Sequence, residues 1–314
     1  MEFGVQSSQA NSRWEDVLGL WQELDKGSRF TSLWVVDHFV TGFGTAFNAY
    51  GPHLEGWTLL SALAYATSRV RVGVLVSGVT YRHPAVLAKM ATTVDHISGG
   101  RLNFGIGAAW HEFEHRCYGI PFPSVRERMG RLEEAVHLIK LLWTSNNSPV
   151  TWKGRYYHLE EAPYNPPNVQ QPHPPIYIGG GGERRTLRIA AQYADAMNVF
   201  GSPEEVAHKV EVLRRHCQEV GRDPAQIRIT VTLPFLPTED EERIGRMVAG
   251  MSAYQGISQE QARRRILAGS FSQMREHLAH YAQLGVQEVF LQPFIRLQPE
   301  PFLRFSEEVI APFS

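Results

Sequence analysis

The sequence predicts an α/β fold, a (β/α)₈ TIM barrel with insertions. Short β-branched runs alternate with longer helical patterns along the chain, which is typical of parallel βαβ units. Eight such strands with helices between them favour a closed barrel over an open doubly wound sheet. The chain has 314 residues, which fits one barrel of roughly 250 residues plus insertions, so we expect a single domain over residues 1–314.

Each predicted strand is a short run rich in apolar residues, and each predicted helix carries apolar residues three or four positions apart. The strands are Phe3–Gln6, Thr31–Val36, Val70–Val76, Arg101–Gly107, Pro175–Gly179, Ala196–Phe200, Ile227–Leu233 and Glu288–Gln292. The helices are Trp14–Asp25, Gly56–Ala66, Pro84–His96, Val125–Trp143, Glu183–Tyr193, Pro203–Val220 and Pro301–Ile310. Gly27 ends the first helix, Pro84 suits a first helical turn, and Ser202 suits an N-cap.

Two segments interrupt this alternation, at about residues 145–174 and 238–269. The first is long, polar and rich in proline, and the second adds helical pattern before the last helix and strand. Insertions in a barrel usually lie over the carboxyl ends of the strands, where the active site is built. We therefore expect both segments near that mouth.

The composition argues against several classes of protein. Lys and Arg number 31 against 32 Asp and Glu, so there is no basic field to bind nucleic acid or an anionic membrane. The two cysteines cannot form a disulfide framework, and the N-terminus lacks the pattern of a signal peptide. No run approaches the ~20 apolar residues of a membrane span. We expect a cytoplasmic enzyme with a small-molecule substrate.

Polar residues directly after barrel strands are the first candidates for chemistry. Asp37 and His38 follow the second strand, and Ser77 and Gly78 end the third. The alternatives are that Asp37 bonds nearby backbone, that His38 fills a core position, and that the Ser-Gly pair forms an ordinary turn. In the functional interpretation, the small residues Ser77 and Gly78 allow a flat ligand to approach the backbone at the end of the strand.

The fourth strand ends in small residues followed by Trp110, His111 and Glu112. His111 or Glu112 could act as a general acid or base, although acidic residues are also common in solvated loops. Residues 111–115 read His-Glu-Phe-Glu-His, which matches the HExxH spacing of a zinc site. No pair of closely spaced cysteines accompanies it, and we expect no metal site.

Four consecutive glycines, Gly179, Gly180, Gly181 and Gly182, follow the fifth strand, and Arg184 stands just beyond them. Free backbone N–H groups, a helix start and a guanidinium group together favour a phosphate site. The spacing matches neither the Rossmann nor the P-loop motif, and a plain flexible loop is the alternative.

Taken in succession, these pieces resemble the bacterial luciferase-like superfamily over nearly the whole chain. The matching pieces are Leu33–Phe39, Val72–Val76, Thr80–Ala85, Thr92–Leu102, Gly105–Glu112, Tyr118–Phe122 and Pro174 through the glycine run. The Ser-Gly-Gly-Arg-Leu stretch and the glycine run are most similar to the branch that uses the deazaflavin coenzyme F420. Ala109 departs from the pattern, since relatives often have glycine there.

The resemblance implies a cofactor ring at the mouth of the barrel and a non-proline cis peptide after the third strand, here at Ser77–Gly78. It implies that Asp37 and His38 approach the ring, that Gly179–Gly182 with Arg184 hold the phosphate, and that Trp110 borders the substrate side together with His111 and Glu112. It also implies an aromatic substrate pocket, to which Phe43, Phe47, Trp57 and Trp110 would contribute.

The leading hypothesis from this resemblance is an oxidoreductase that transfers a hydride between F420 and a small organic substrate. The alternatives are a reduced-FMN monooxygenase of the same fold and a non-catalytic flavin-binding barrel. We assign the proton to His38, because an imidazole titrates near neutral pH unaided, and the orientation of substrate to Glu112. Luciferase-like barrels commonly pair, so we also expect a homodimer, formed through the apolar outer face of residues 84–96.

Overall fold

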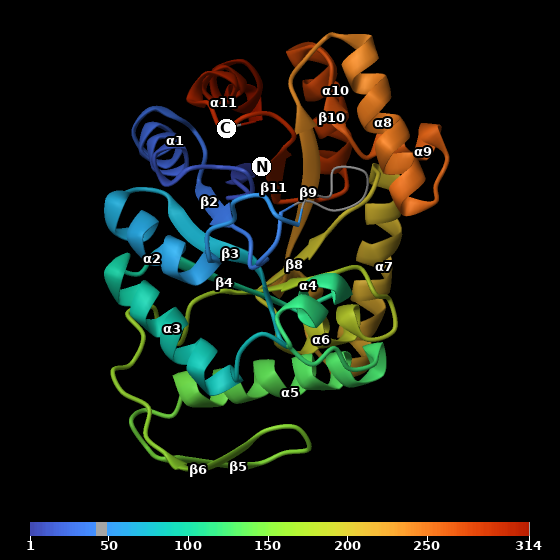
Figure 1. Ribbon diagram of the computed structural model, residues 1–314. Coiled ribbons are helices and arrows are strands. Elements are labelled where there is room, and N and C mark those ends of the chain that lie inside the picture. The colour runs from blue at the N-terminus through green and yellow to red at the C-terminus, as the bar shows by residue number, and fades with distance from the viewer. Residues whose placement is uncertain (42–48, 314) are drawn as a thin grey trace.

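The computed structural model describes residues 1–41 and 49–313 (Figure 1). Within these residues, eight parallel strands form a closed ring in the order β9, β11, β1, β2, β3, β4, β7, β8, and β8 pairs again with β9. The strands of the ring are β1 (Glu2–Gln6), β2 (Ser32–Val35), β3 (Arg71–Gly78), β4 (Leu102–Gly107), β7 (Ile176–Gly179), β8 (Ala196–Val199), β9 (Arg228–Leu236) and β11 (Glu288–Pro293). The predicted barrel is confirmed, and every predicted strand is present to within a few residues.

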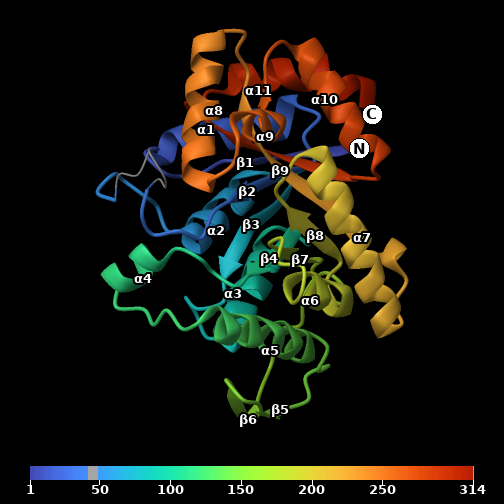
Figure 2. The same ribbon diagram turned by 90° about the vertical axis from the view of Figure 1, so that its right-hand side faces the viewer.

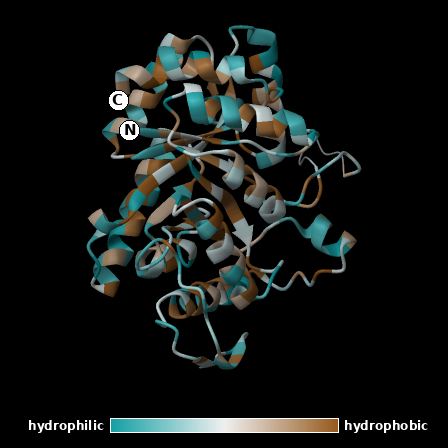
Figure 3. Ribbon diagram, turned by 90° about the vertical axis from the view of Figure 1, so that its left-hand side faces the viewer, coloured by the Kyte–Doolittle hydropathy of each residue, from teal (hydrophilic) through white to brown (hydrophobic). Residues whose placement is uncertain are grey.

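Helices surround the ring (Figures 1 and 2). They are α1 (Trp14–Gly27), α2 (Gly56–Ala66), α3 (Pro84–Ile97), α4 (Glu112–Cys117), α5 (Val125–Trp143), α6 (Thr186–Tyr193), α7 (Pro203–Val220), α8 (Glu241–Gln255), α9 (Gln259–Arg264), α10 (Phe271–Gln283) and α11 (Pro299–Phe305). Ser202 caps α7 in a capping box with Glu205, and Pro84 lies in the first turn of α3, both as predicted. In Figure 3 the central strands are mostly hydrophobic, and the helices around them carry hydrophilic residues.

The two insertions lie in different places. Residues 238–269 form α8, α9 and the short strand β10 (Leu267–Ala268), which pairs with the carboxyl end of β9. Residues 145–174 contain the hairpin β5 (Val150–Lys153) and β6 (His158–Ala162), which lies outside α5 (Figure 1). The side chain of Gln170 donates to the carbonyl of Leu102, the first residue of β4, at 2.7 Å. The expectation that this insertion covers the mouth is therefore wrong, because it follows a helix that returns to the opposite end of the barrel.

Large side chains fill the inside of the barrel. The indole of Trp34 meets the rings of Tyr177 and Phe290 edge to face, with centroids 5.0 and 5.1 Å apart. Gly73 makes room for this packing, since a Cβ there would lie 2.5 Å from the Trp34 ring. With the interior filled in this way, a ligand has room only at the ends of the barrel.

The main hydrophobic core lies between the strands and the surrounding helices and includes residues from Phe3 to Ile310. Among the helices within residues 1–41 and 49–313, none has both the length and the apolar character required of a membrane span.

Candidate active site

The third strand is irregular where it reaches the mouth of the barrel. Val74 pairs with Phe104 and Ser77 pairs with Ile106, so two residues of β3 oppose one residue of β4. The Leu75–Val76 peptide between them is cis. The prediction of a cis bond at Ser77–Gly78 is thus wrong by two residues, because Ser77 and Gly78 pair in regular register and the irregularity lies where the register shifts.

Glycines on the two neighbouring strands accommodate the Val76 side chain. A Cβ on Gly107 would lie 2.8 Å from one Val76 methyl carbon, and a Cβ on Gly179 would lie 2.7 Å from the other. Side chains at these two positions would collide with Val76, which is only partly buried. Val76 and the two glycines therefore form a low floor at the mouth, above the aromatic interior.

Asp37 fixes the chain beside this floor. Its Oδ2 atom accepts hydrogen bonds from the Gly78 N–H at 3.0 Å and from Nη1 of Arg82 at 2.8 Å. Its Oδ1 atom is buried and has no hydrogen-bond partner among the described residues. Burial raises the pKa of Asp37 to about 6, against the opposing effect of the Arg82 guanidinium. An unpaired buried oxygen is costly, so Oδ1 is a candidate acceptor for a ligand.

Ser77 points its side chain into the core. Its hydroxyl accepts a hydrogen bond from the Trp57 indole at 3.0 Å, and both residues are almost fully buried. Trp57 therefore supports the mouth from behind, whereas the sequence prediction placed it in the substrate pocket. Phe43 and Phe47, also predicted for that pocket, lie outside the described residues.

The imidazole of His38 is held by a carboxylate that the sequence analysis did not select. Nδ1 of His38 lies 2.8 Å from Oε1 of Glu114, which also accepts a hydrogen bond from the Tyr81 hydroxyl. Oε2 of Glu114 accepts from the Phe39 N–H at 2.9 Å. Although burial opposes it, hydrogen bonds from His111, His38 and Tyr81 hold the pKa of Glu114 well below its usual range.

Glu112 and Glu114 lie on different faces of α4. Glu112 is exposed at the first turn, whereas Glu114 is fully buried and points toward His38. Their spacing in a helix explains the difference, since residues two apart do not share a face. One sequence pattern could have indicated Glu114: it stands three residues after His111, so in a helical turn the two side chains lie on the same face. The role given to Glu112 in orienting the substrate stays a prediction.

Neighbouring residues complete this side of the mouth. Trp110 is half exposed and meets the His38 ring edge to face at 5.4 Å. Ala109 has a φ of 60°, in the left-handed region that favours glycine, so the backbone suits the glycine that the resemblance led us to expect there. The buried His115 fastens α4 by two hydrogen bonds, from Nδ1 to the His111 carbonyl at 2.8 Å and at Nε2 with the Thr80 hydroxyl at 2.7 Å.

His38, His111 and Glu114 are also close enough to be considered as metal ligands, since one atom from each lies within 4.8 Å of the others. However, both carboxylate oxygens of Glu114 already accept hydrogen bonds from protein donors. Two ligands of one zinc ion lie roughly 3.3 Å apart, given metal–ligand distances near 2.0 Å. Nδ1 of His38 and Oε1 of Glu114 are closer than that, at 2.8 Å. His115, the second histidine of the motif at residues 111–115, uses both of its ring nitrogens in hydrogen bonds. The arrangement is that of a hydrogen-bonded cluster.

The glycine run lies across the mouth, between β7 and α6. The N–H of Gly180 donates to the Asn198 carbonyl at 3.0 Å, so this group is already used. No described residue accepts a hydrogen bond from the N–H of Gly181 or Gly182. The ammonium of Lys209, on α7, donates to the Gly181 carbonyl at 3.0 Å, while Arg184 is exposed. Sequence reasoning missed Lys209, because its position in the middle of a helix gives no local signal.

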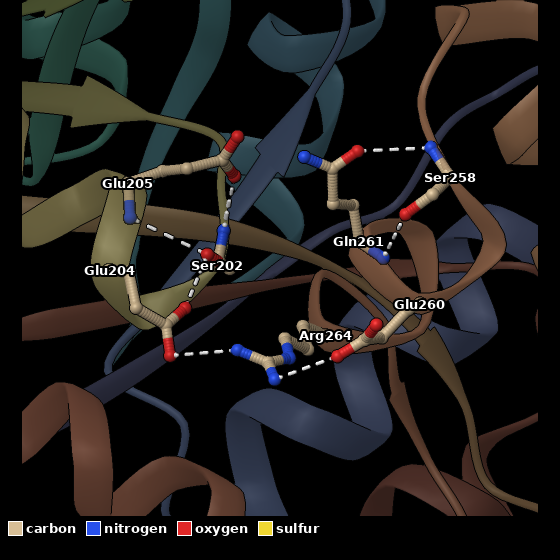
Figure 4. Close-up of a pocket in the computed structure, with 7 residues that line it drawn as sticks. All are labelled: Ser202, Glu204, Glu205, Ser258, Glu260, Gln261 and Arg264. Atoms are coloured by element: carbon tan, nitrogen blue, oxygen red, sulfur yellow. Dashed lines mark hydrogen bonds and ion pairs between the residues drawn. The ribbon is translucent and has the colours of Figure 1, made fainter.

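A separate polar pocket of about 540 Å³ lies between the N-terminal ends of α7 and α9 (Figure 4). It is lined by Ser202, Glu204, Glu205, Ser258, Glu260, Gln261 and Arg264. Arg264 lies between two of its carboxylates, on Glu204 and Glu260. None of the lining residues belongs to the His38 cluster or the glycine run, so we place the active site at the barrel mouth instead.

Comparison with known proteins agrees with this fold. The chain is 34% identical over 176 residues to the phthiodiolone/phenolphthiodiolone dimycocerosates ketoreductase of Mycobacterium tuberculosis, covering 55% of this chain and 45% of the relative. It is 34% identical over 214 residues to the F420-dependent glucose-6-phosphate dehydrogenase of Kineococcus radiotolerans, covering 67% and 60%. The chain thus spans about half the length of the curated relatives it matches.

A structure of an F420-dependent secondary alcohol dehydrogenase with an F420–acetone adduct superposes with a TM-score of 0.82 at 20% identity, covering 99% of this chain and 97% of that one. At this identity the likeness concerns the fold. The model of the luciferase-like monooxygenase family matches residues 1–281. The chain therefore belongs to the luciferase-like monooxygenase family.

Proposed function

We propose that this chain is an oxidoreductase that transfers a hydride between the deazaflavin coenzyme F420 and a small organic substrate. The observation that carries the proposal is an imidazole held by a buried carboxylate, His38 with Glu114. It directly follows Asp37, whose hydrogen bond from Gly78 joins this group to the strand that carries Val76. The F420-dependent dehydrogenase of Kineococcus radiotolerans, similar over two thirds of this chain, supports the choice of cofactor.

The residues present fit such a cofactor. Oδ1 of Asp37 is a buried acceptor that has no described partner, and a ring N–H or hydroxyl of a ligand would satisfy it. Across the mouth, the N–H groups of Gly181 and Gly182 and the ammonium of Lys209 favour an anion such as a phosphate. Arg184, predicted for the same role, is near these groups in sequence and is exposed.

F420 supplies the hydride chemistry when it is bound. The protein has to bind it, orient the substrate, exclude water and balance the charge with a proton. His38 is the group we assign to the proton, since its Nδ1 is held by Glu114 and its second nitrogen is left for the substrate. Trp110 would contribute an apolar wall to the substrate side.

A reduced-FMN monooxygenase is the second candidate, because the family model that matches the chain is that of luciferase-like monooxygenases. Titrations of the protein's tryptophan fluorescence with oxidised F420 and with FMN distinguish the two. We expect quenching by F420 at micromolar concentration, followed by reduction of bound F420 when alcohols or sugar phosphates are added. Tight binding of FMN alone would favour the monooxygenase, and binding without turnover of any substrate would favour a non-catalytic barrel.

We also propose that the protein is a cytoplasmic homodimer. Tyr65 on α2 and Val86 and Ile97 on α3 are exposed apolar residues, and these two helices pack against each other. A second copy would cover this face. Sedimentation at micromolar concentration is expected to give a species of twice 35.5 kDa, and a single species of 35.5 kDa would contradict the dimer.

A further inference from the structure

We infer that Glu114 is a positioning residue, which holds His38 with its proton on Nδ1 so that the neutral ring offers Nε2 as an acceptor at the mouth. This inference rests on the proposed function only for its consequence in catalysis. The hydrogen-bond geometry that motivates it belongs to the protein alone.

The hydrogen bond between His38 and Glu114 needs a proton on one of its two atoms. An ionised carboxylate can only accept hydrogen bonds. Glu114 is fully buried and receives the Tyr81 hydroxyl and the Phe39 N–H in addition to His38. Such surroundings stabilise the charged form of a carboxylate. The short contact of 2.8 Å to Nδ1 of His38 therefore requires a proton on Nδ1.

Neighbouring side chains restrain the imidazole ring of His38. The His38 side chain is about one quarter exposed, whereas Glu114 is not exposed at all. Trp110 and His111 lie edge-on to the imidazole, with centroids 5.4 and 5.8 Å away. The ring is thus bonded on one side and restrained by its neighbours, and the nitrogen left for a ligand is Nε2.

The Glu114 carboxylate is itself fixed by its neighbours. Glu114 lies on α4, which His115 fastens to the barrel through Thr80. Tyr81, which bonds to Glu114, follows β3 and packs against the ring of Phe39 at 4.8 Å. The carboxylate is therefore held between the segments that follow β2, β3 and β4, and it joins the orientation of His38 to all three.

The test begins with the protein as it stands, without cofactor. Nitrogen-15 NMR of the histidine rings reports the tautomer, and the spectrum of His38→Asn identifies the His38 signals. We expect His38 to be mainly in the Nδ1–H form at a pH where it is neutral. A mainly Nε2–H form would overturn the inference, and this measurement needs no variant of Glu114.

The variant Glu114→Gln keeps the shape and removes the charge. We expect it to lower the Nδ1–H population of His38 and to lower kcat by about 10²-fold, the lower end of what general acid–base catalysis contributes, while KM changes only a few-fold. Glu114→Asp should restore part of both. Glu160→Gln, on the exposed hairpin strand β6, is the matched control for loss of one carboxylate. An unchanged tautomer and kcat in a folded Glu114→Gln protein would contradict the inference.

The two proposals fail separately. If F420 does not bind but the tautomer of His38 depends on Glu114, the cofactor proposal is wrong and the positioning role stands. If F420 binds and turns over but the tautomer is the opposite one, the positioning role is wrong and the proposed function stands.

Discussion

Stability should fall in mild acid because two partly buried histidines, His53 and His277, are held neutral in the folded chain. Burial lowers the pKa of His53, beside the active site, and of His277, on α10, from 6.5 to about 4 in each case. The unfolded chain therefore binds a proton at each position near pH 6.5, whereas the folded chain does so only near pH 4. Since the unfolded state binds more protons between these values, acid favours unfolding in that window.

The size of the effect follows from the shifts. One pKa unit corresponds to about 1.4 kcal/mol, so at pH 5 each histidine costs at most about 2 kcal/mol of unfolding free energy relative to pH 7. Together the two give an upper bound of about 4 kcal/mol, a large fraction of a typical domain's stability. Asp37 acts in the opposite direction, because its raised pKa of about 6 means that the folded state takes up its proton first and is favoured as the pH falls through 6.

Urea unfolding at pH 7 and pH 5, followed by fluorescence and circular dichroism, measures this difference. His53→Gln and His277→Gln should each reduce the loss between the two pH values by about 1–2 kcal/mol, and the double variant should reduce it by their sum. The cost of the substitution itself cancels when the free energies of unfolding at the two pH values are subtracted for one protein. The contribution of Asp37 cancels when this difference is compared between the parent protein and a variant. An equal loss in the parent protein and the double variant would refute the argument.

Three further predictions concern the mouth of the barrel. Lys209→Met should weaken binding of F420 by about 10- to 100-fold, as expected for loss of a hydrogen bond to a charged group. Added salt should reduce this difference in affinity between the parent protein and the variant. Equal affinities in isothermal titration would show that Lys209 is not part of the site. Replacing both Gly180 and Gly181 with bulkier residues should weaken cofactor binding without unfolding the barrel. The reason is that Gly180 has a φ of 126° and a Cβ on Gly181 would meet the Lys209 ammonium at 2.8 Å. Unchanged affinity in the folded variant would speak against the anion site. His38→Asn should lower turnover by ~10²-fold or more and abolish one limb of the pH–rate profile; a variant that loses only cofactor affinity would show that His38 merely positions the ring.

The barrel was predictable because its signal is repeated. Eight strands, each followed by a helical pattern, leave few other folds, and an error of one or two residues at an element's end does not change the topology. Local devices such as the Ser202 cap and Pro84 in the first turn of α3 were also predictable. They depend on residues adjacent in the sequence, which is the range over which sequence patterns are informative.

The details of the site depend on contacts between distant segments, and these were predicted less well. The bulge at Leu75–Val76 is explained by Gly107 and Gly179, which make space for Val76 from two other strands. Lys209 reaches the glycine run from a helix that begins some twenty residues later in the chain. No periodicity along β3 or α7 carries that information.

The predicted carboxylate on the loop after β4 illustrates the same limit on a smaller scale. Glu112 and Glu114 are two positions apart, and either could face His38 until the direction of α4 is known. The turn places Glu114 inward and Glu112 outward. The type of residue and the loop were thus predictable, but the residue that bonds to His38 was not.

The two sides of α4 have different freedom to change during evolution. Glu114 and His115 face inward and are bonded to the barrel, so substitutions there would disturb His38. Arg116 and Cys117 are exposed on the same short helix, and Tyr118 just beyond it is more than half exposed. New side chains on this outer side could alter which molecules enter the mouth while the inner side is retained. Directed evolution for altered substrate range would therefore begin at positions 116 and 117, since Tyr118 donates to the Phe39 carbonyl and packs on its ring.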